Sequence, residues 1–315
     1  MKYIAQEKQK NRRVFNVLGH ILLIISIIYI ARLLCLNFDN IFGIVSVSQV
    51  FKYLVPSVAL YVLSFLILSI IWFKLIKIFT TEPLNLTACI TSLSKSQIAK
   101  YLPGNVLHYV GRYIISTIYD IPPKSIAISI FLETLMLIIS ACILSIYLFW
   151  NYNNMQLFVF KDTKFFMLYF FIVFIILLVF LAYKRNLVSK FLGTIKEYFE
   201  CIKQSYCVLI FAFLGYISFF CILGIILWYL NGIFIPLEAK YLMTFIAMSS
   251  LAWVIGYITP GAPGGVGIRE AILIVGLSSS FPENEILLLT FVFRLVSILG
   301  DIILFLLGTA LNRKL

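Results

Sequence analysis

The chain has 315 residues whose composition is that of a protein that uses lipid as its solvent. Hydrophobic residues make up 62% of the sequence and charged residues only 12%, with a mean hydropathy of +1.05. Soluble domains carry roughly 25% charged residues, so this chain is excluded from that class. The formal net charge of +12 therefore indicates orientation in a bilayer rather than binding to nucleic acid.

The cysteines and histidines do not indicate a metal site. The six cysteines form no Cys-x-x-Cys pair and most lie in apolar runs, and only two histidines occur. Buried cysteine commonly serves as a small apolar side chain. We therefore expect neither a metal nor another cofactor.

Six apolar runs are long enough to cross a bilayer, which takes about 20 mainly apolar residues. They cover about 14–36, 54–76, 126–149, 165–183, 207–230 and 285–310. The first run follows a basic segment, is longer than the core of a signal peptide and lacks a small-x-small cleavage site. We expect it to be a retained membrane span.

Two further apolar segments are interrupted by glycine and proline. Segment 86–118 is broken at Pro103-Gly104, and segment 240–279 is broken between Pro260 and Gly265. Each arm has about 14–20 residues, which is marginal for a full crossing. Because irregular backbone at membrane depth must be surrounded by protein or line a cavity, we expect two re-entrant helical hairpins.

The basic residues predict an orientation for these elements. With both termini on the cytoplasmic side, fifteen of the 25 lysines and arginines fall on that side, four on the opposite side and six at membrane depth. Basic loops tend to stay in the cytoplasm. We therefore expect a multi-pass protein of the cell (inner or plasma) membrane with a cytoplasmic N-terminus and a cytoplasmic C-terminus.

The order of the elements predicts two membrane halves, 1–150 and 151–315. Each half reads span, span, hairpin, span, and corresponding elements are offset by about 149 to 159 residues. The halves begin on opposite sides of the membrane. The expected fold is thus an all-α integral membrane protein built as an inverted-topology repeat, in which paired interrupted segments indicate a transport site.

The first hairpin carries polar side chains on both sides of its break. Helical spacing places Gln97, Lys100 and Tyr101 on one face. The break and the second arm add Pro103, Gly104, Asn105, His108 and Arg112. We interpret these residues as part of a substrate site; the alternative is a snorkelling Lys100 and a structural Arg112.

The second break is rich in glycine and leads into a charged pair. Its candidate site residues are Pro260, Gly261, Pro263, Gly264, Gly265, Gly267, Arg269 and Glu270. Glycine lets a ligand approach the backbone closely, and the N–H groups that begin a helix attract anions. No strand precedes the loop, so the glycine pattern does not indicate a nucleotide site.

Three more charged residues lie within expected spans: Glu133, Arg294 and Asp301. Charged groups inside a membrane are costly and are candidates for a functional site. Arg294 and Asp301 are seven residues apart on one face of the last span. The simpler alternative is mutual pairing, for example of Glu133 with Arg294 or of Glu270 with Arg112.

These motifs together resemble the transmembrane domain of lysylphosphatidylglycerol synthases and its free-standing, flippase-like relatives. The resemblance rests on Q-x-x-K-Y-x-P-G from Gln97, on P-G-G-x-G-x-R-E from Pro263, and on a later arginine in the last span. It covers nearly the whole chain. It implies movement of an aminoacylated phospholipid, or of a polyprenyl-phosphate-linked sugar, between leaflets. Because no soluble domain follows Leu315 in this sequence, we expect translocation rather than synthesis.

The expected function is that of a lipid flippase or transporter and not that of an enzyme. A lining with more cations than carboxylates suits an anionic or phosphate-bearing head group. The expected partner is a membrane lipid, with a homo-oligomer left open and no nucleic acid. Two alternatives are a membrane-embedded transferase acting on a lipid-linked substrate, and a non-transporting membrane partner of a lipid or polysaccharide biosynthetic complex.

The predicted topology can be tested with single cysteines in a cysteine-free background. We expect Asn153→Cys and Ser279→Cys to react with an impermeant thiol reagent in intact cells, and Asn186→Cys to be protected, because the basic loop should face the cytoplasm. Labelling of Asn186→Cys together with protection of Ser279→Cys would contradict the inverted arrangement.

Overall fold

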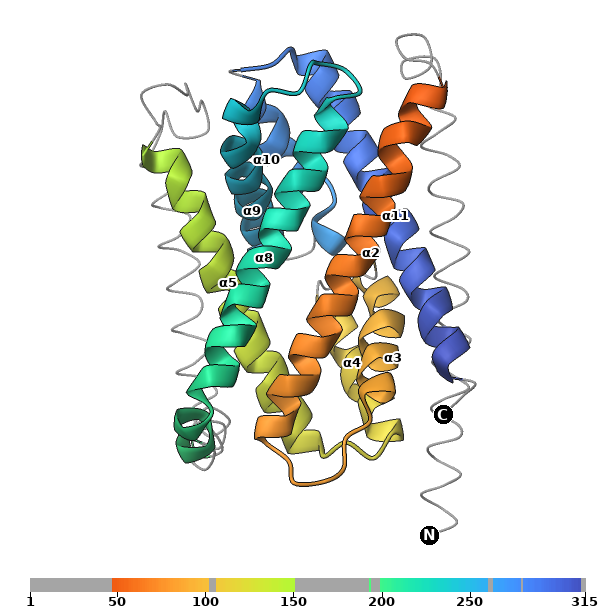
Figure 1. Ribbon diagram of the computed structural model, residues 1–315, viewed down its shortest axis with the longest axis vertical. Helices are drawn as coiled ribbons and strands as arrows, with labels where there is room; N and C mark the ends of the chain where they lie inside the picture. The colour runs from red at the N-terminus through yellow and green to blue at the C-terminus, as the bar shows by residue number, and fades with distance from the viewer. Residues whose placement is uncertain are drawn as a thin grey trace.

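The computed structural model describes residues 47–101, 106–150, 193, 199–259, 263–278 and 280–312. All regular structure in these residues is helical (Figure 1). The expected spans 14–36 and 165–183 lie outside the described residues. The described part of the chain is an all-α multi-pass membrane protein, as the composition predicts.

Four long helices coincide with four of the expected spans. They are α2 (Val47–Ile78), α5 (Pro123–Trp150), α8 (Tyr206–Asn231) and α11 (Glu283–Asn312). The shortest has 26 residues, and at 1.5 Å per residue such a helix is about 39 Å long. That length exceeds the roughly 30 Å hydrocarbon core of a bilayer.

A fifth helix, α9 (Leu242–Ile258), is also long enough to cross. With the short 3₁₀ helix η4 (Ala239–Tyr241) before it, it forms an apolar run of 20 residues with a mean hydropathy of 1.6. The sequence predicted this segment only as a hairpin arm of marginal length. In the described residues, five helices are therefore long and apolar enough to span a membrane.

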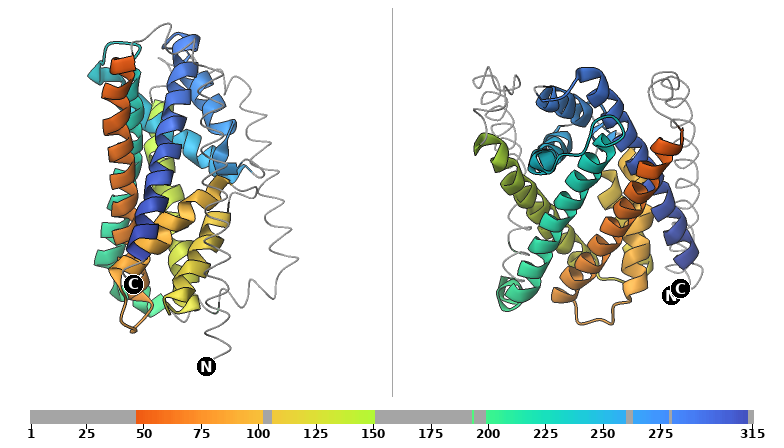
Figure 2. Two further views of the ribbon diagram at one scale, coloured as in Figure 1. Left: turned by 90° about the vertical axis from the view of Figure 1, so that its right-hand side faces the viewer. Right: turned by 45° about the horizontal axis from the view of Figure 1, so that its top comes forward.

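The remaining helices are too short to do so. They are α3 (Leu86–Ser96), followed by the 3₁₀ helix η1 (Gln97–Tyr101), then α4 (Leu107–Ile118), and α10 (Ile268–Leu277), preceded by the 3₁₀ turn η5 (Pro263–Gly265). Helices α3 and α4 lie together in the lower half of Figure 1, and α9 and α10 in the upper half; both views of Figure 2 agree. Turns η1 and η5 contact each other where the two pairs meet.

Local sequence explains how the short helices begin. The side chain of Asn85 accepts a hydrogen bond from the backbone N–H of Thr87 at 2.9 Å and caps α3. Before α10 the backbone takes φ values of +60°, +72° and +83° at Gly264, Gly265 and Gly267. Only glycine adopts such angles readily, so the glycine run turns the chain into α10 within a few residues.

The long helices pack through large buried side chains and one close backbone contact. Trp72 of α2, Tyr216 and Phe220 of α8 and Phe245 of α9 are fully buried. At Gly224, helix α8 lies so close to α9 that an added Cβ would overlap the Cα of Ile246 and lie 2.8 Å from its backbone nitrogen. Small residues at such contacts are how membrane helices pack, since lipid offers no hydrophobic drive.

The α8–α9 contact predicts the effect of a single methyl group. Gly224→Ala should lower the thermal stability of the detergent-purified protein by about 1–3 kcal/mol, because the overlap is with backbone and cannot be relieved by rotamer change. Gly215→Ala is the matched control in the same helix, because its Cβ would meet only the flexible end of the Ile71 side chain. Equal stability of the two variants would contradict this packing.

Candidate functional site

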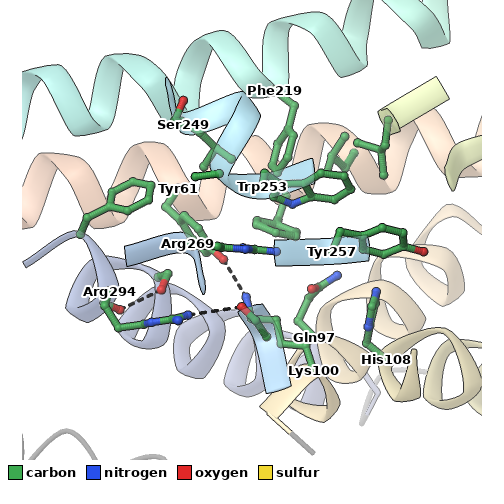
Figure 3. Close-up of a pocket in the computed structure, with 18 of the residues that line it drawn as sticks. Tyr61, Gln97, Lys100, His108, Phe219, Ser249, Trp253, Tyr257, Arg269 and Arg294 are labelled. Carbon is green, nitrogen blue, oxygen red and sulfur yellow. Dashed lines mark hydrogen bonds between the residues drawn. The ribbon is translucent and has the colours of Figure 1, made fainter. Parts of the chain in front are cut away.

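A cavity of about 120 Å³ lies where the two pairs of short helices approach each other. Its wall is built from α2, η1, α4, α5, α8, α9, η5, α10 and α11 (Figure 3). Nine of the site residues expected from the sequence line it: Gln97, Lys100, His108, Arg112, Glu133, Gly264, Arg269, Glu270 and Arg294. Residues far apart in the chain are thus brought to one place.

Lys100 and Asp301 form the first of three ion pairs at this site. The Lys100 Nζ lies 2.6 Å from Oδ2 of Asp301, which is completely buried in α11. The hydroxyl of Tyr101 donates to the same carboxylate at 2.6 Å. Tyr61 of α2 donates to the other oxygen at 3.2 Å and accepts a hydrogen bond from Lys100 at 2.9 Å. Among the described residues, the polar contacts of the Asp301 carboxylate are therefore all with donors.

Arg112 and Glu133 form the second pair. The Nη1 of Arg112, on α4, lies 2.5 Å from Oε2 of Glu133, on α5, and both residues are only 2% exposed. The guanidinium lies over the rings of Trp72 and Tyr109, at 4.9 and 5.5 Å from the ring centroids. A burial this complete makes the pair a permanent link between the two helices.

Arg294 and Glu270 form the third pair, beside the glycine-rich turn. The Nε and Nη2 of Arg294, on α11, lie 2.7 and 2.5 Å from Oε1 of Glu270, on α10. The other carboxylate oxygen of Glu270 accepts from the backbone N–H of Gly267 at 2.8 Å and so caps α10. The N-terminus of a helix attracts negative charge, and here Glu270 supplies that charge.

Arg269 also lines the cavity, but it belongs to none of these three ion pairs. None of the carboxylates in the described residues forms an ion pair with it. Its side chain passes Gly265 and Gly256, where an added Cβ would come within 2.5 and 2.6 Å of it, and its guanidinium lies 5.8 Å from the ring centroid of Trp253. Figure 3 shows it extended between Tyr61 and Trp253. Because Gly265 and Gly256 have no Cβ, the space beside them is free for the side chain of Arg269.

The pairing of charges differs from the examples considered in the sequence analysis. Glu133 pairs with Arg112 and not with Arg294, and Glu270 pairs with Arg294 and not with Arg112. Each carboxylate takes the arginine of a helix packed against its own, α4 on α5 and α10 on α11. Spacing along the sequence carries no information on which helices are neighbours.

The sequence predicted that Gln97, Lys100 and Tyr101 share one face of an α-helix, and the structure differs from this prediction as well. These residues lie in the 3₁₀ helix η1, where positions i and i+3 eclipse and position i+4 does not. Gln97 and Lys100 accordingly line the cavity, and Tyr101 instead reaches Asp301. The expected α-helical face was wrong because the tighter turn has a period of three.

Several expected site residues lie outside the cavity or outside the description. Asp301 and Tyr101 sit behind Lys100, and Gly267 caps α10 without lining the cavity. Pro263 begins η5. Five positions fall outside the described residues: Pro103, Gly104, Asn105, Pro260 and Gly261.

The aromatic part of the wall was not predicted from the sequence. It is formed by Tyr61, Phe65, Tyr109, Phe219, Trp253, Tyr257 and Phe293. Trp253 and Tyr257 stack with their ring centroids 5.0 Å apart and their planes 3° from parallel. Both pairs, Tyr61 with Phe65 and Trp253 with Tyr257, have i, i+4 spacing, which could have indicated an aromatic face. In an apolar helix such spacing is common, so it did not stand out.

His108 lines the cavity, and one of its ring nitrogens lacks a hydrogen-bond partner among the described residues. Its Nδ1 is buried and has no hydrogen-bond partner among the described residues. The ring packs against Tyr109 with centroids 3.9 Å apart. A buried nitrogen without a partner is unfavourable, so a ligand or a water in the cavity would stabilise it.

Comparison of the chain with models of known protein families finds no match, and comparison with curated proteins also finds none.

The Arg112–Glu133 pair predicts a large loss of stability when one partner is neutralised. Glu133→Gln should destabilise the protein by about 3–5 kcal/mol, because it leaves a buried guanidinium without a counter-ion. Thermal unfolding in detergent measures the loss. Glu270→Gln is the control; Glu270 is 25% exposed at the cavity, so its loss should cost less. A Glu133→Gln variant as stable as wild type would show that the pair carries no such role.

Proposed function

We propose that this protein is a carrier that moves a lipid with an anionic, phosphate-bearing head group between the leaflets of the cell membrane. The observation that carries the proposal is the charge balance of the site. Four cations, Lys100, Arg112, Arg269 and Arg294, face three carboxylates, and Arg269 is left without one. An unbalanced arginine at membrane depth favours an anionic ligand.

The size and wall of the cavity support a head group rather than a whole lipid. A volume of about 120 Å³ holds several waters or a small polar group but no acyl chains. Polar groups on one side, including Gln97 and Arg269, face the stacked rings of Trp253 and Tyr257 on the other. The chains of the lipid would remain in the bilayer while the head group enters.

The direction of the helices supports the inverted repeat that such a carrier requires. In Figure 1 helix α2 runs downward and α8 upward, and α5 runs upward and α11 downward. The α3–α4 pair opens toward the bottom and the α9–α10 pair toward the top. We therefore propose that these pairs are the two re-entrant hairpins and that their meeting point is the transport site.

The arrangement of carboxylates favours a carrier over a transferase. General acid–base catalysis needs a carboxyl group free to exchange a proton with the substrate. Glu133 and Glu270 each contact an arginine of the protein itself, and Asp301 contacts Lys100 and does not line the cavity in which a substrate would lie. The resemblance to the membrane domain of lysylphosphatidylglycerol synthases points toward the same lipid carrier.

Arg269 is the residue whose replacement should separate transport from folding. Arg269→Gln and Arg269→Lys should each slow leaflet exchange by about tenfold or more, because a planar charge-assisted contact to phosphate is lost. Arg269→Gln should be as stable as wild type or more stable, since it removes a desolvated cation that has no carboxylate partner among the described residues. Arg269→Lys keeps the charge as a more strongly hydrated ammonium, so its expected effect is on exchange and not a gain in stability. The assay is reconstitution into liposomes with fluorescent phosphatidylglycerol and an impermeant quencher.

Lys240→Gln is the matched control for loss of one positive charge. Lys240 is exposed and pairs with Glu238 at the edge of the molecule, so exchange should be unchanged. Wild-type exchange by both Arg269 variants would contradict the phosphate site. Absence of exchange by wild-type protein, combined with turnover of a lipid-linked donor, would favour the transferase.

A further inference from the structure

The Lys100–Asp301 pair differs from the other two in the kind of cation it uses. Glu133 and Glu270 are each held by an arginine, whereas Asp301 is held by a lysine. A guanidinium is a planar fork that stays in register with its carboxylate, but an ammonium is a compact charge on a flexible stem. Of these three carboxylates, Asp301 is the one whose counter-ion can most easily move away.

Lys100 lies between its carboxylate and the cavity. Its side chain lines the cavity and is 16% exposed, whereas Asp301 is completely buried behind it and does not line the cavity. The ammonium is 5.4–5.7 Å from the ring centroids of Tyr61, Phe65 and Tyr101. A rotation of the lysine side chain would carry its charge from Asp301 to a ligand in the cavity.

We propose that Asp301 is a proton-binding site that couples the entry of an anionic head group to the uptake of a proton. The inference rests on the proposed function, because the head group is what draws Lys100 away. A buried carboxylate that loses its only cationic contact is strongly unfavourable. A proton from water then adds to one carboxylate oxygen, and it leaves again when Lys100 returns. Ligand binding and proton binding are thereby linked.

The groups around Asp301 suit a proton better than a metal ion. Among the described residues, the contacts of its carboxylate are the ammonium of Lys100 and the phenol groups of Tyr61 and Tyr101. Two phenol oxygens and one carboxylate are too few for a hard metal cation, which takes six or more oxygen ligands. A protonated carboxyl needs only one acceptor, which a rotated tyrosine hydroxyl supplies.

Charged and titratable groups reach the pair from several elements. Lys95 of α3 is buried against α11 at Gly308, about two helical turns beyond Asp301. Lys100 and Tyr101 face Asp301 from η1, and Tyr61 faces it from α2. Arg294 of α11 and Arg269 of α10 act on Lys100 through repulsion. A head group that neutralises Arg269 would also relieve this repulsion and let Lys100 approach the ligand.

The test measures protons taken up during binding. Dihexanoyl phosphatidylglycerol is titrated calorimetrically into the detergent-purified full chain in buffers of different ionisation enthalpy; its phosphodiester is a monoanion near neutral pH, so exchanged protons come from the protein. We expect about one proton taken up per lipid bound near neutral pH, and about zero in the Lys100→Met/Asp301→Asn double variant. Binding by wild type without proton uptake would overturn the coupling.

A second measurement needs no ligand, so it separates this inference from the proposed function. In Lys100→Met the counter-ion of Asp301 is permanently absent, and the infrared spectrum should gain the carbonyl band of a protonated carboxylic acid. The band should vanish in the double variant, whose net charge equals that of wild type. If wild type binds no lipid, the proposed function fails and this spectrum decides the proton site. An ionised Asp301 in Lys100→Met overturns it.

Discussion

A buried charge is costly unless a neighbour neutralises it, and each of the three ion pairs at the cavity joins two different helices. Lys100 of η1 pairs with Asp301 of α11, Arg112 of α4 with Glu133 of α5, and Glu270 of α10 with Arg294 of α11. Each pair joins a short element to a long helix. Loss of one partner would leave a buried charge uncompensated, so ion pairs hold the short helices against the long ones in addition to packing.

The glycine-rich turn η5 shapes the backbone at the cavity so that the charged side chains fit there. Glycines at 264, 265 and 267 take left-handed angles and bring η5 against η1, where Gly264 lies near the carbonyl of Lys100. Gly265 and Gly256 leave a channel for the side chain of Arg269. The glycines that turn the chain into α10 thus also position Arg269, the one arginine among the described residues that pairs with no carboxylate.

The sequence predicted the elements of this structure better than their contacts. Composition and apolar runs were enough for α2, α5, α8 and α11, because a helix of that length in lipid depends on local sequence alone. Charged residues at membrane depth identified much of the cavity, since such residues are rare without a purpose. The partners of Arg112 and Glu270 were not predictable, because they depend on which helices pack together. The 3₁₀ form of η1 was also missed, because the spacing of polar residues alone does not distinguish a 3₁₀ helix from an α-helix over five residues.

Helix α11 carries one member of two of the ion pairs, and this has a mechanical consequence. Arg294 and Asp301 are two helical turns apart, about 10 Å along the axis, yet one reaches up to α10 and the other across to η1. A slide or rotation of α11 would strain both contacts at once. Helix α11 therefore couples α10 and η1 mechanically, and a movement that breaks one of these two ion pairs loads the other.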